Sequence, residues 1–244
     1  MGDKTKIDWC DASWNPVTGC LHGCEYCYAR GIANRFGSNQ MPIFTEKPVL
    51  REPVIIDGRI QPYPFDFMPT FHRYRLGIPA RWTKPRTIFV CSMADLFGEW
   101  VPDEWIREVF NACEKAPQHR YLFLTKNPTR YTKLLTRYTP PNMWFGWSQT
   151  GPFEREKMHF NVHHSVNIFV SIEPLLKPIE RPNFMADWYI VGAETGRRKG
   201  KVTPEKEWVM EIAEMGREQE KPVFMKESLR DIMGDDFIQQ YPWD

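Results

Sequence analysis

Short apolar runs recur along this 244-residue chain, and their spacing constrains the fold more than any other feature. Each run is closed by polar residues, and most are followed by a stretch with helical character. An earlier strand is expected near Trp14 to Gly19. Strands separated by roughly 20 to 35 residues, with helices between them, are typical of βα units around a parallel sheet. The later runs are Thr87 to Cys91, Tyr121 to Leu124, Met143 to Trp147, Asn167 to Ile172, Trp188 to Gly192 and Pro222 to Met225.

Three of the intervening stretches are predicted to be helices. Val101 to Ala116 carries apolar residues on one face at the spacing of an amphipathic helix. Pro128 is expected to open the second helix, where its missing N–H costs nothing. Thr203 and Pro204 are predicted to be the N-cap and first-turn residues of a third helix that ends near Gln219.

The fold class that follows is α/β, in the form of a partial, open (β/α)6-type TIM barrel. About six or seven βα units are present, and too few residues remain for a barrel of eight units and about 250 residues. The stretch from about residue 37 to 86 interrupts the regular spacing of apolar runs, because it is rich in proline and aromatic residues and has little periodicity. We expect it to be an insertion that packs on the barrel, so that residues 1–244 form a single domain.

A polar group follows every apolar run, at the position where a parallel βα fold binds its ligands. Any sheet must end in polar residues, so each position taken alone also fits a purely structural role. The alignment of charged or amide-bearing groups at the strand ends favours a functional site. The residues concerned are Ser92, Asp95, Thr125, Lys126, Ser148, Gln149, Glu173, Glu194 and Lys226.

The charge balance excludes binding by a general positive field. Lys and Arg total 32 against 31 for Asp and Glu, so the net charge is +1 and any nucleic-acid contact needs a local patch. No apolar run reaches the roughly 18 residues that suggest a membrane span, and the N-terminus is charged. We therefore expect a soluble, cytoplasmic protein without a membrane partner. In such a reducing compartment, clustered cysteines more often bind metal or do redox chemistry than form disulfides.

Cys20, Cys24 and Cys27 form a C-x3-C-x2-C triplet just after the first predicted strand. Three thiolates so close in sequence can surround one soft metal centre, zinc or iron–sulfur. A closed structural site normally has four protein ligands, whereas a cubane held by three leaves one iron open. Two alternatives remain at this point: a zinc site completed by His22 or Cys10, and three unrelated core cysteines. Gly19 and Gly23 supply backbone freedom for a tight loop.

This triplet, with Tyr26 as the aromatic residue before the last cysteine, resembles the signature of the radical S-adenosylmethionine (SAM) superfamily. The resemblance implies a partial barrel with a [4Fe–4S] cluster on the three cysteines and SAM on the fourth iron. It further implies reductive cleavage of SAM to a 5′-deoxyadenosyl radical that abstracts hydrogen from the substrate. The cofactor would supply the chemistry, and the barrel would position and shield it.

The resemblance also assigns SAM-binding roles to the strand ends. Many members hold the SAM amino group with a Gly-Gly-Glu after the second strand, which this sequence lacks; Ser92 and Asp95 are the substitutes. Tyr26 would border the adenine, and Arg30 would meet the SAM carboxylate or be a charge on a helix surface. The ribose and methionine contacts would come from Ser148, Gln149, Glu173 and Glu194.

Within the superfamily the chain resembles a small phage-type branch distantly similar to spore photoproduct lyase, on the segments VCSMADLF, LTKNP, SIEPL and GAETG. That branch implies modified thymine in DNA as the substrate, most specifically isomerisation of 5-Nα-glycinylthymidine to the Cα-linked form. It implies an electron donor such as flavodoxin or ferredoxin, and the cytoplasm of the host cell. The alternatives are a repair lyase or modifying enzyme on another nucleic acid or peptide, and a non-enzymatic nucleic-acid-binding module stapled by zinc or a cluster.

Two basic stretches are candidates for contacting nucleic acid. Residues 117–153 contain five Lys or Arg and no acid, interleaved with Tyr131, Tyr138 and Trp144, and could hold phosphates and stack a base. The second stretch is Gly196 to Lys201. Either stretch fits equally well as a solvated surface that binds nothing. A base in a duplex would have to flip into the barrel. Lys126 and Lys226 are candidates to pair with a substrate carboxylate in the catalytic site.

The other three cysteines have simpler expected roles. Cys91 and Cys113 are expected to be buried as small hydrophobic residues. Cys10 is expected to be a loop thiol or, alternatively, a donor of hydrogen to a product radical.

Overall fold

The structure is a computed structural model that describes residues 5–37, 49–65, 67–135, 139–152, 166–179, 186–196 and 198–244. The chain divides into two compact units, Met1–Thr125 and Lys126–Asp244, called here the first and the second unit. In the two basic stretches discussed above, residues 136–138, which include Tyr138, and residues 153 and 197 lie outside the described ranges. The expectation of a single domain stays a prediction.

The first unit contains three parallel strands: β1 (Ala12–Trp14), β6 (Thr87–Val90) and β7 (Arg120–Thr125). All four residues of β6 are buried, which explains why it reads as a continuous apolar run. The connection from β6 to β7 contains α2 (Asp103–Glu114), which buries Trp105, Ile106, Val109, Ala112 and Cys113. The predicted helix from 101 to 116 is therefore confirmed.

The expected first strand is in fact two strands. β1 ends at Trp14, and after Asn15 and Pro16 the chain enters β2 (Val17–Thr18). β2 pairs antiparallel with β5 (Thr70–Phe71) in a separate small sheet. Proline cannot donate to a ladder, and strands tend to end where it occurs. The cysteine triplet thus follows β2, and α1 (Tyr28–Phe36) begins immediately after it.

The insertion packs on the core of the first unit. It contains β3 (Ile55–Ile56), β4 (Arg59–Ile60) and β5, followed by two short 3₁₀ helices at Arg73–Arg75 and Pro79–Arg81. Phe71 stacks on Trp105 at 4.9 Å between ring centroids, and the Trp14 indole donates to the Arg75 carbonyl at 2.9 Å.

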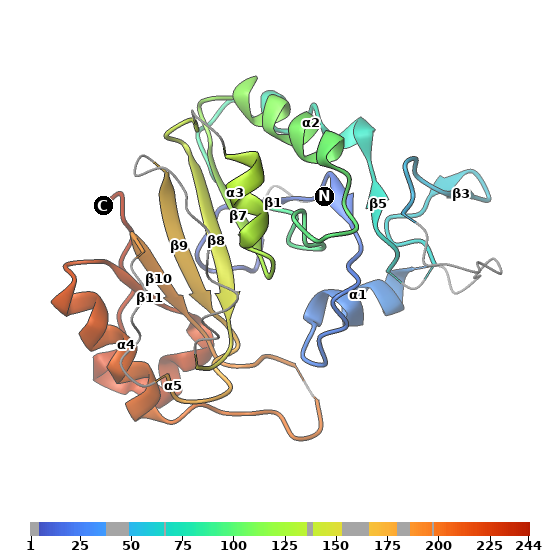
Figure 1. Ribbon diagram of the computed structural model, residues 1–244. Coiled ribbons are helices and arrows are strands. Elements are labelled where there is room, and N and C mark those ends of the chain that lie inside the picture. The colour runs from blue at the N-terminus through green and yellow to red at the C-terminus, as the bar shows by residue number, and fades with distance from the viewer. Residues whose placement is uncertain are drawn as a thin grey trace. The chain divides into compact units, whose positions relative to one another are not determined.

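The second unit contains four parallel strands, which lie side by side in Figure 1: β8 (Met143–Gln149), β9 (Asn167–Ile172), β10 (Trp188–Val191) and β11 (Val223–Met225). Its helices are α3 (Thr129–Leu134), α4 (Lys206–Glu218), α5 (Arg230–Met233) and the 3₁₀ turns at Glu227–Leu229 and Gly234–Asp236. The predicted N-cap of α4 is wrong by two residues, because Glu205 and not Thr203 precedes the helix.

The predicted fold class is confirmed. Numbered along the chain, the strand order is β1-β6-β7 in the first unit and β8-β9-β10-β11 in the second. Within each unit, this sequential order of parallel strands is what successive βα units produce. None of the described helices is both long enough and apolar enough to cross a membrane.

Candidate functional site

The cysteine loop, defined here as Gly19 to Cys27, has a backbone conformation that favours glycine at two points. Gly19 has φ of 89° and Gly23 has φ of 70°, both in the left-handed region. Gly19 is also crowded, because a Cβ there would lie 2.1 Å from the Met68 carbonyl oxygen. The loop is fixed by main-chain bonds from Gly19 N–H to the Met93 carbonyl (2.9 Å) and from Cys20 N–H to the Phe67 carbonyl (3.1 Å).

The three thiols of the loop are half-buried. Cys27 is the N-cap of α1, and its Sγ accepts the Arg30 backbone N–H at 3.4 Å. Cys20 and Cys27 pack against a buried cluster formed by Ala29, Ala33, Phe67 and Met93. Burial, opposed by a backbone hydrogen bond, raises the pKa of the Cys20 thiol to about 12. A cationic centre would favour the thiolate there, because metal ligation requires a deprotonated sulfur.

The donor chemistry of the loop fits a soft metal or an iron–sulfur cluster, since it offers three thiols on one short loop. In the part of the chain that the structure describes, no group of three His, Cys, Asp or Glu side chains is arranged to hold a metal ion. The assignment of the three cysteines as ligands therefore rests on their spacing in the sequence. The structure shows in addition how the loop that carries them is held in place.

His22 connects the loop to the segment that follows β6. Its Nε2 lies 2.7 Å from Asp95 Oδ2, and its ring meets Trp100 edge-on at 4.8 Å between centroids. Asp95 is buried and also accepts, at Oδ1, the Phe97 N–H (3.0 Å) and the Thr125 hydroxyl (2.7 Å). The carboxylate that the sequence assigns to SAM binding thus has both oxygens in hydrogen bonds that organise the loop.

Arg30 and Tyr28 brace the loop from α1. Arg30 Nη2 donates to the Cys20 carbonyl at 3.0 Å, and its guanidinium lies 5.7 Å from the Phe67 ring centroid. The Tyr28 hydroxyl donates to the Ser92 carbonyl at 2.9 Å. Sequence reasoning did not single out Tyr28, although its place directly after the last cysteine is a usable signal. Tyr26 is half-buried.

Ser92 is held in place by Asn15, which sequence reasoning also missed. The Ser92 hydroxyl donates to Asn15 Oδ1 at 3.2 Å, and the same oxygen accepts the Met93 N–H at 2.9 Å. Among the residues assigned from the sequence, the first unit thus brings together Cys20, Cys24, Cys27, Tyr26, Arg30, Ser92 and Asp95.

In the second unit, Glu173 and Lys226 form an ion pair just beyond the carboxyl ends of β9 and β11. Both side chains are mostly buried. Gly192, directly after β10, leaves room for the pair, since a Cβ there would lie 2.8 Å from Lys226 Cδ and 3.2 Å from Glu173 Cγ. Two of the charged residues that follow the predicted strands therefore meet at this edge.

Two further assigned residues of the second unit, Glu194 and Gln149, are held by hydrogen bonds. Glu194 is buried, accepts two hydrogen bonds from Arg198 (2.6 and 2.8 Å) and a third from the Val202 N–H (3.3 Å). The Arg198 hydrogen bonds lower the pKa of Glu194. The Gln149 amide donates to the Gly151 carbonyl at 2.6 Å, while Ser148 and Lys126 are half-buried.

The predicted basic and aromatic surface over residues 117–153 is wrong for two of its three rings, Tyr131 and Trp144. Tyr131 is fully buried and its hydroxyl donates to the Gly146 carbonyl at 2.9 Å. Trp144 is buried and meets Trp243 edge-on at 5.7 Å. Neither ring can stack a base. In the second stretch, Gly196 to Lys201, Arg198 is paired with Glu194.

The remaining cysteines behave as expected. Cys91 and Cys113 are buried, and burial raises the pKa of both thiols. Cys10 is half-buried, and its thiol donates to the Ile7 carbonyl across a 3.8 Å contact.

Comparisons with known proteins place this arrangement of βα units and a cysteine loop in a family. Residues 4–230 match the family described as "Protein of unknown function (DUF5131)", and the chain belongs to that family. One solved structure, a cysteine-to-serine mutant of spore photoproduct lyase, is similar over 79% of this chain with 12% identity and a TM-score of 0.43. The chain spans 60% of that lyase chain. The search of curated proteins found no match.

Proposed function

We propose that this protein is a radical SAM enzyme that acts on nucleic acid. The observation that carries the proposal is the cysteine loop, in which three half-buried thiols lie on one glycine-shaped turn anchored to the Met93 and Phe67 carbonyls. Cys20, Cys24 and Cys27 would hold a [4Fe–4S] cluster there, and together with SAM the cluster would supply radical chemistry that removes hydrogen from a substrate.

The residues around the loop hold it in shape. Gly19 and Gly23 let the chain turn closely, and the His22–Asp95 contact fixes the segment between the first two cysteines. Arg30 holds the Cys20 carbonyl and covers the Phe67 ring. Preorganisation of this kind keeps ligands in position without a cost at the moment of binding.

Anaerobic reconstitution tests the cluster. The wild-type chain should take up about four iron and four sulfide and become brown with broad absorption near 400 nm, whereas zinc gives a colourless protein. Cys20→Ala, Cys24→Ala and Cys27→Ala should each lose the cluster. Cys10→Ala, a half-buried loop thiol outside the triplet, should keep it. A colourless wild-type protein containing one zinc would overturn the proposal and favour a zinc-stapled binding module.

Reductive SAM cleavage tests the activity. The reconstituted protein with dithionite, or with flavodoxin or ferredoxin as electron donor, should form 5′-deoxyadenosine, and the cysteine variants should not. A protein that carries the cluster but forms none, with or without nucleic acid, is not a radical SAM enzyme.

For the substrate, we propose modified thymine in phage DNA, specifically 5-Nα-glycinylthymidine converted to its Cα-linked isomer. The glycyl carboxylate needs a cation, and Lys126 and Lys226 follow β7 and β11. Lys226 would have to exchange Glu173 for the substrate, which gives Glu173 the role of holding the lysine in place. Chromatography of nucleosides from glycinylthymidine DNA should show the isomer; turnover of another polymer but not of this DNA would overturn the assignment.

A further inference from the structure

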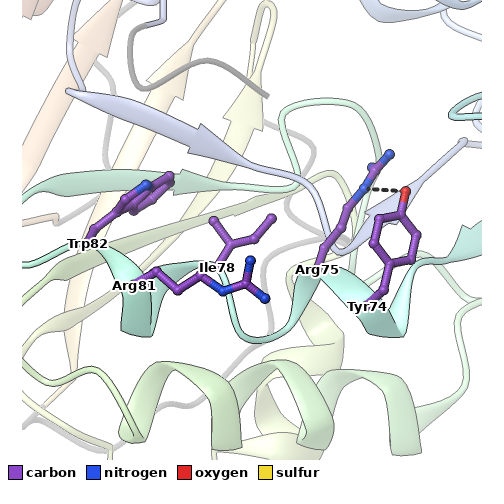
Figure 2. A pocket seen from close by; sticks show the side chains of 5 residues that line it. All are labelled: Tyr74, Arg75, Ile78, Arg81 and Trp82. Atoms are coloured by element: carbon purple, nitrogen blue, oxygen red, sulfur yellow. Dashed lines mark hydrogen bonds between the residues drawn. The ribbon is translucent and has the colours of Figure 1, made fainter.

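An open pocket of about 450 Å³ lies outside the cysteine loop, in the first unit. It is called here the arginine pocket, and its lining comes from the segment that joins β5 to β6. The lining residues are Tyr74, Arg75, Ile78, Arg81 and Trp82. Figure 2 shows these side chains in a row, with Trp82 at one end, Tyr74 at the other and the two arginines between them. Arg75 is buried, so the pocket presents one exposed cationic group, Arg81, and two aromatic rings.

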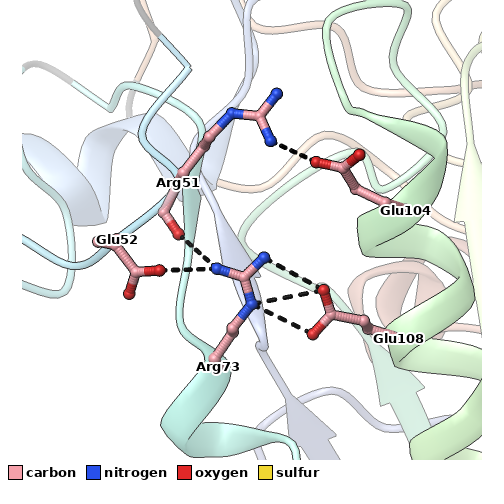
Figure 3. Close-up of polar contacts among 5 residues, drawn as sticks. All are labelled: Arg51, Glu52, Arg73, Glu104 and Glu108. Carbon is pink, nitrogen blue, oxygen red and sulfur yellow. Dashed lines mark hydrogen bonds and ion pairs between the residues drawn. The ribbon is translucent and has the colours of Figure 1, made fainter.

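The segment around this pocket is strongly basic. Residues 67–94 contain five Lys or Arg and no Asp or Glu. Arg73 is neutralised from outside the segment, because it pairs with Glu52 (2.7 Å) and Glu108 (3.2 Å), as Figure 3 shows. Arg81 is exposed, and neither Arg81 nor Lys84 forms an ion pair with an acid among the described residues. The pocket thus carries positive charge that the described part of the chain does not balance.

The two rings of the pocket are accessible. Tyr74 is 48% exposed, and its hydroxyl accepts a hydrogen bond from Arg75 Nε at 3.0 Å. Trp82 is half-buried, and the Arg86 guanidinium lies 4.9 Å from its ring centroid. Cations that hold phosphates, next to rings on which bases stack, are the two elements of single-strand binding. Tyr131 and Trp144, the rings that the sequence pattern proposed for this purpose, are buried.

Hydrogen bonds connect the arginine pocket to the cysteine loop. Arg75 Nη1 donates to the Asn15 carbonyl at 2.9 Å, and Asn15 Oδ1 accepts the Met93 N–H at 2.9 Å. The Met93 carbonyl in turn accepts the N–H of Gly19, which precedes Cys20. A strand held in the pocket would lie beside the support of the cysteine loop, within the same unit.

We propose that the arginine pocket binds a single-stranded segment of the nucleic-acid substrate, with a phosphate at Arg81 and a base against Trp82. The proposal rests on the proposed function for its substrate class and adds where the strand is held. Contacts to phosphates position a strand without reading its sequence, so the pocket should bind single strands with little base preference.

Fluorescence anisotropy with a labelled 12-nucleotide oligothymidylate tests the pocket on the reconstituted full chain. Arg81→Ala should weaken binding several-fold and reduce the slope of log K against log salt by about 1. Trp82→Ala should weaken binding roughly tenfold, as expected for loss of one stacked base. Trp82→Phe should retain most of the affinity, which separates stacking from loss of folding. Arg59→Ala, an exposed arginine on β4, should leave binding unchanged.

Three results would overturn the proposal. One is unchanged oligonucleotide affinity in both Arg81→Ala and Trp82→Ala. Another is that polyglutamate binds to the wild-type protein and loses as much affinity as the oligonucleotide does in Arg81→Ala and Trp82→Ala. That result would make the pocket a general anion site. The third is thymidine monophosphate binding as tightly as the oligonucleotide, which would indicate a free-nucleotide site. Iron content and 5′-deoxyadenosine formation without nucleic acid test the proposed function separately, and Arg81→Ala should change neither.

Discussion

The His22 ring, inside the cysteine loop, meets the carboxylate of Asp95, 73 residues away, at 2.7 Å between Nε2 and Oδ2. Because Asp95 also accepts the Thr125 hydroxyl and the Phe97 N–H, one buried carboxylate joins the loop to the end of β7 and to the segment that follows β6. The shape of the loop therefore depends on a residue that contributes no ligand to it.

Replacing Asp95 tests this dependence. Asp95→Ala leaves the Thr125 hydroxyl and the Phe97 N–H without their acceptor, and each such loss costs about 1–3 kcal/mol. We expect the free energy of unfolding to fall by about 3 kcal/mol in urea titrations, and iron uptake to fall with it. Asp95→Asn keeps one carbonyl acceptor and should lose less. The control is Glu99→Ala, an exposed acid four residues away, which should match wild type. Equal stability of Asp95→Ala and Glu99→Ala would contradict the assigned role.

The two loop glycines should differ in how they tolerate alanine. Both have positive φ, which costs a non-glycine residue about 1 kcal/mol or more. At Gly19 the added Cβ also meets the Met68 carbonyl, whereas at Gly23 nothing lies within 4 Å. Gly19→Ala should therefore unfold at a lower urea concentration than wild type and bind less iron. Gly23→Ala should lose only about 1 kcal/mol of its free energy of unfolding. The ranking fails if Gly23→Ala is the more damaged variant.

His72 predicts a specific pH dependence of stability. Its ring is fully buried, its Nε2 lies 2.9 Å from the Thr18 hydroxyl oxygen, and burial with the nearby Arg75 lowers its pKa to about 3. In the unfolded chain it titrates near 6.5, so between pH 6.5 and about 3 only the unfolded state binds this proton. Stability should fall with decreasing pH across that window, with a slope of up to about 1.4 kcal/mol per pH unit from this residue.

A variant isolates this contribution. His72→Gln offers an amide to Thr18 and does not titrate, so its stability should depend less on pH between about 6 and 3.5 than that of wild type. Parallel curves for the two proteins, from urea unfolding at each pH, would show that His72 is not the source of the slope.

Glu173 and Lys226 should show energetic coupling. Lys226→Met leaves a mostly buried carboxylate unpaired, and Glu173→Gln leaves an ammonium, so each single variant should lose about 1–2 kcal/mol once partial exposure is considered. The double variant should lose less than the sum of the singles. Strict additivity in a double-mutant cycle would contradict the ion pair.

The strands could be predicted from the sequence because their signal is local. Thr87–Val90, Asn167–Ile172 and Trp188–Val191 agree with the apolar runs within one residue, since parallel strands buried on both faces are apolar throughout. The split between β1 and β2 was missed because β2 exists only by pairing with β5, about 50 residues later. Two-residue strands that pair over such a distance produce no alternating hydrophobic pattern in the sequence of either segment.

The candidate site was predictable in its ligands but not in its supports. The cysteine spacing marks the loop, whereas the partner of His22 is Asp95, and nothing near either residue in the sequence points to the other. The same limit applies to Arg73 and Arg81. Both lie in one basic segment, but Glu108, from α2, neutralises Arg73 while Arg81 has no described acidic partner.

One sulfur atom in the loop has two duties. Cys27 Sγ both belongs to the thiol triplet and closes the first turn of α1 through the Arg30 N–H. Alanine at this position removes both a candidate metal ligand and the helix cap. Serine removes the sulfur but keeps the cap, because a hydroxyl is among the preferred N-cap groups. Comparing the two substitutions thus separates what the atom does for iron from what it does for the polypeptide.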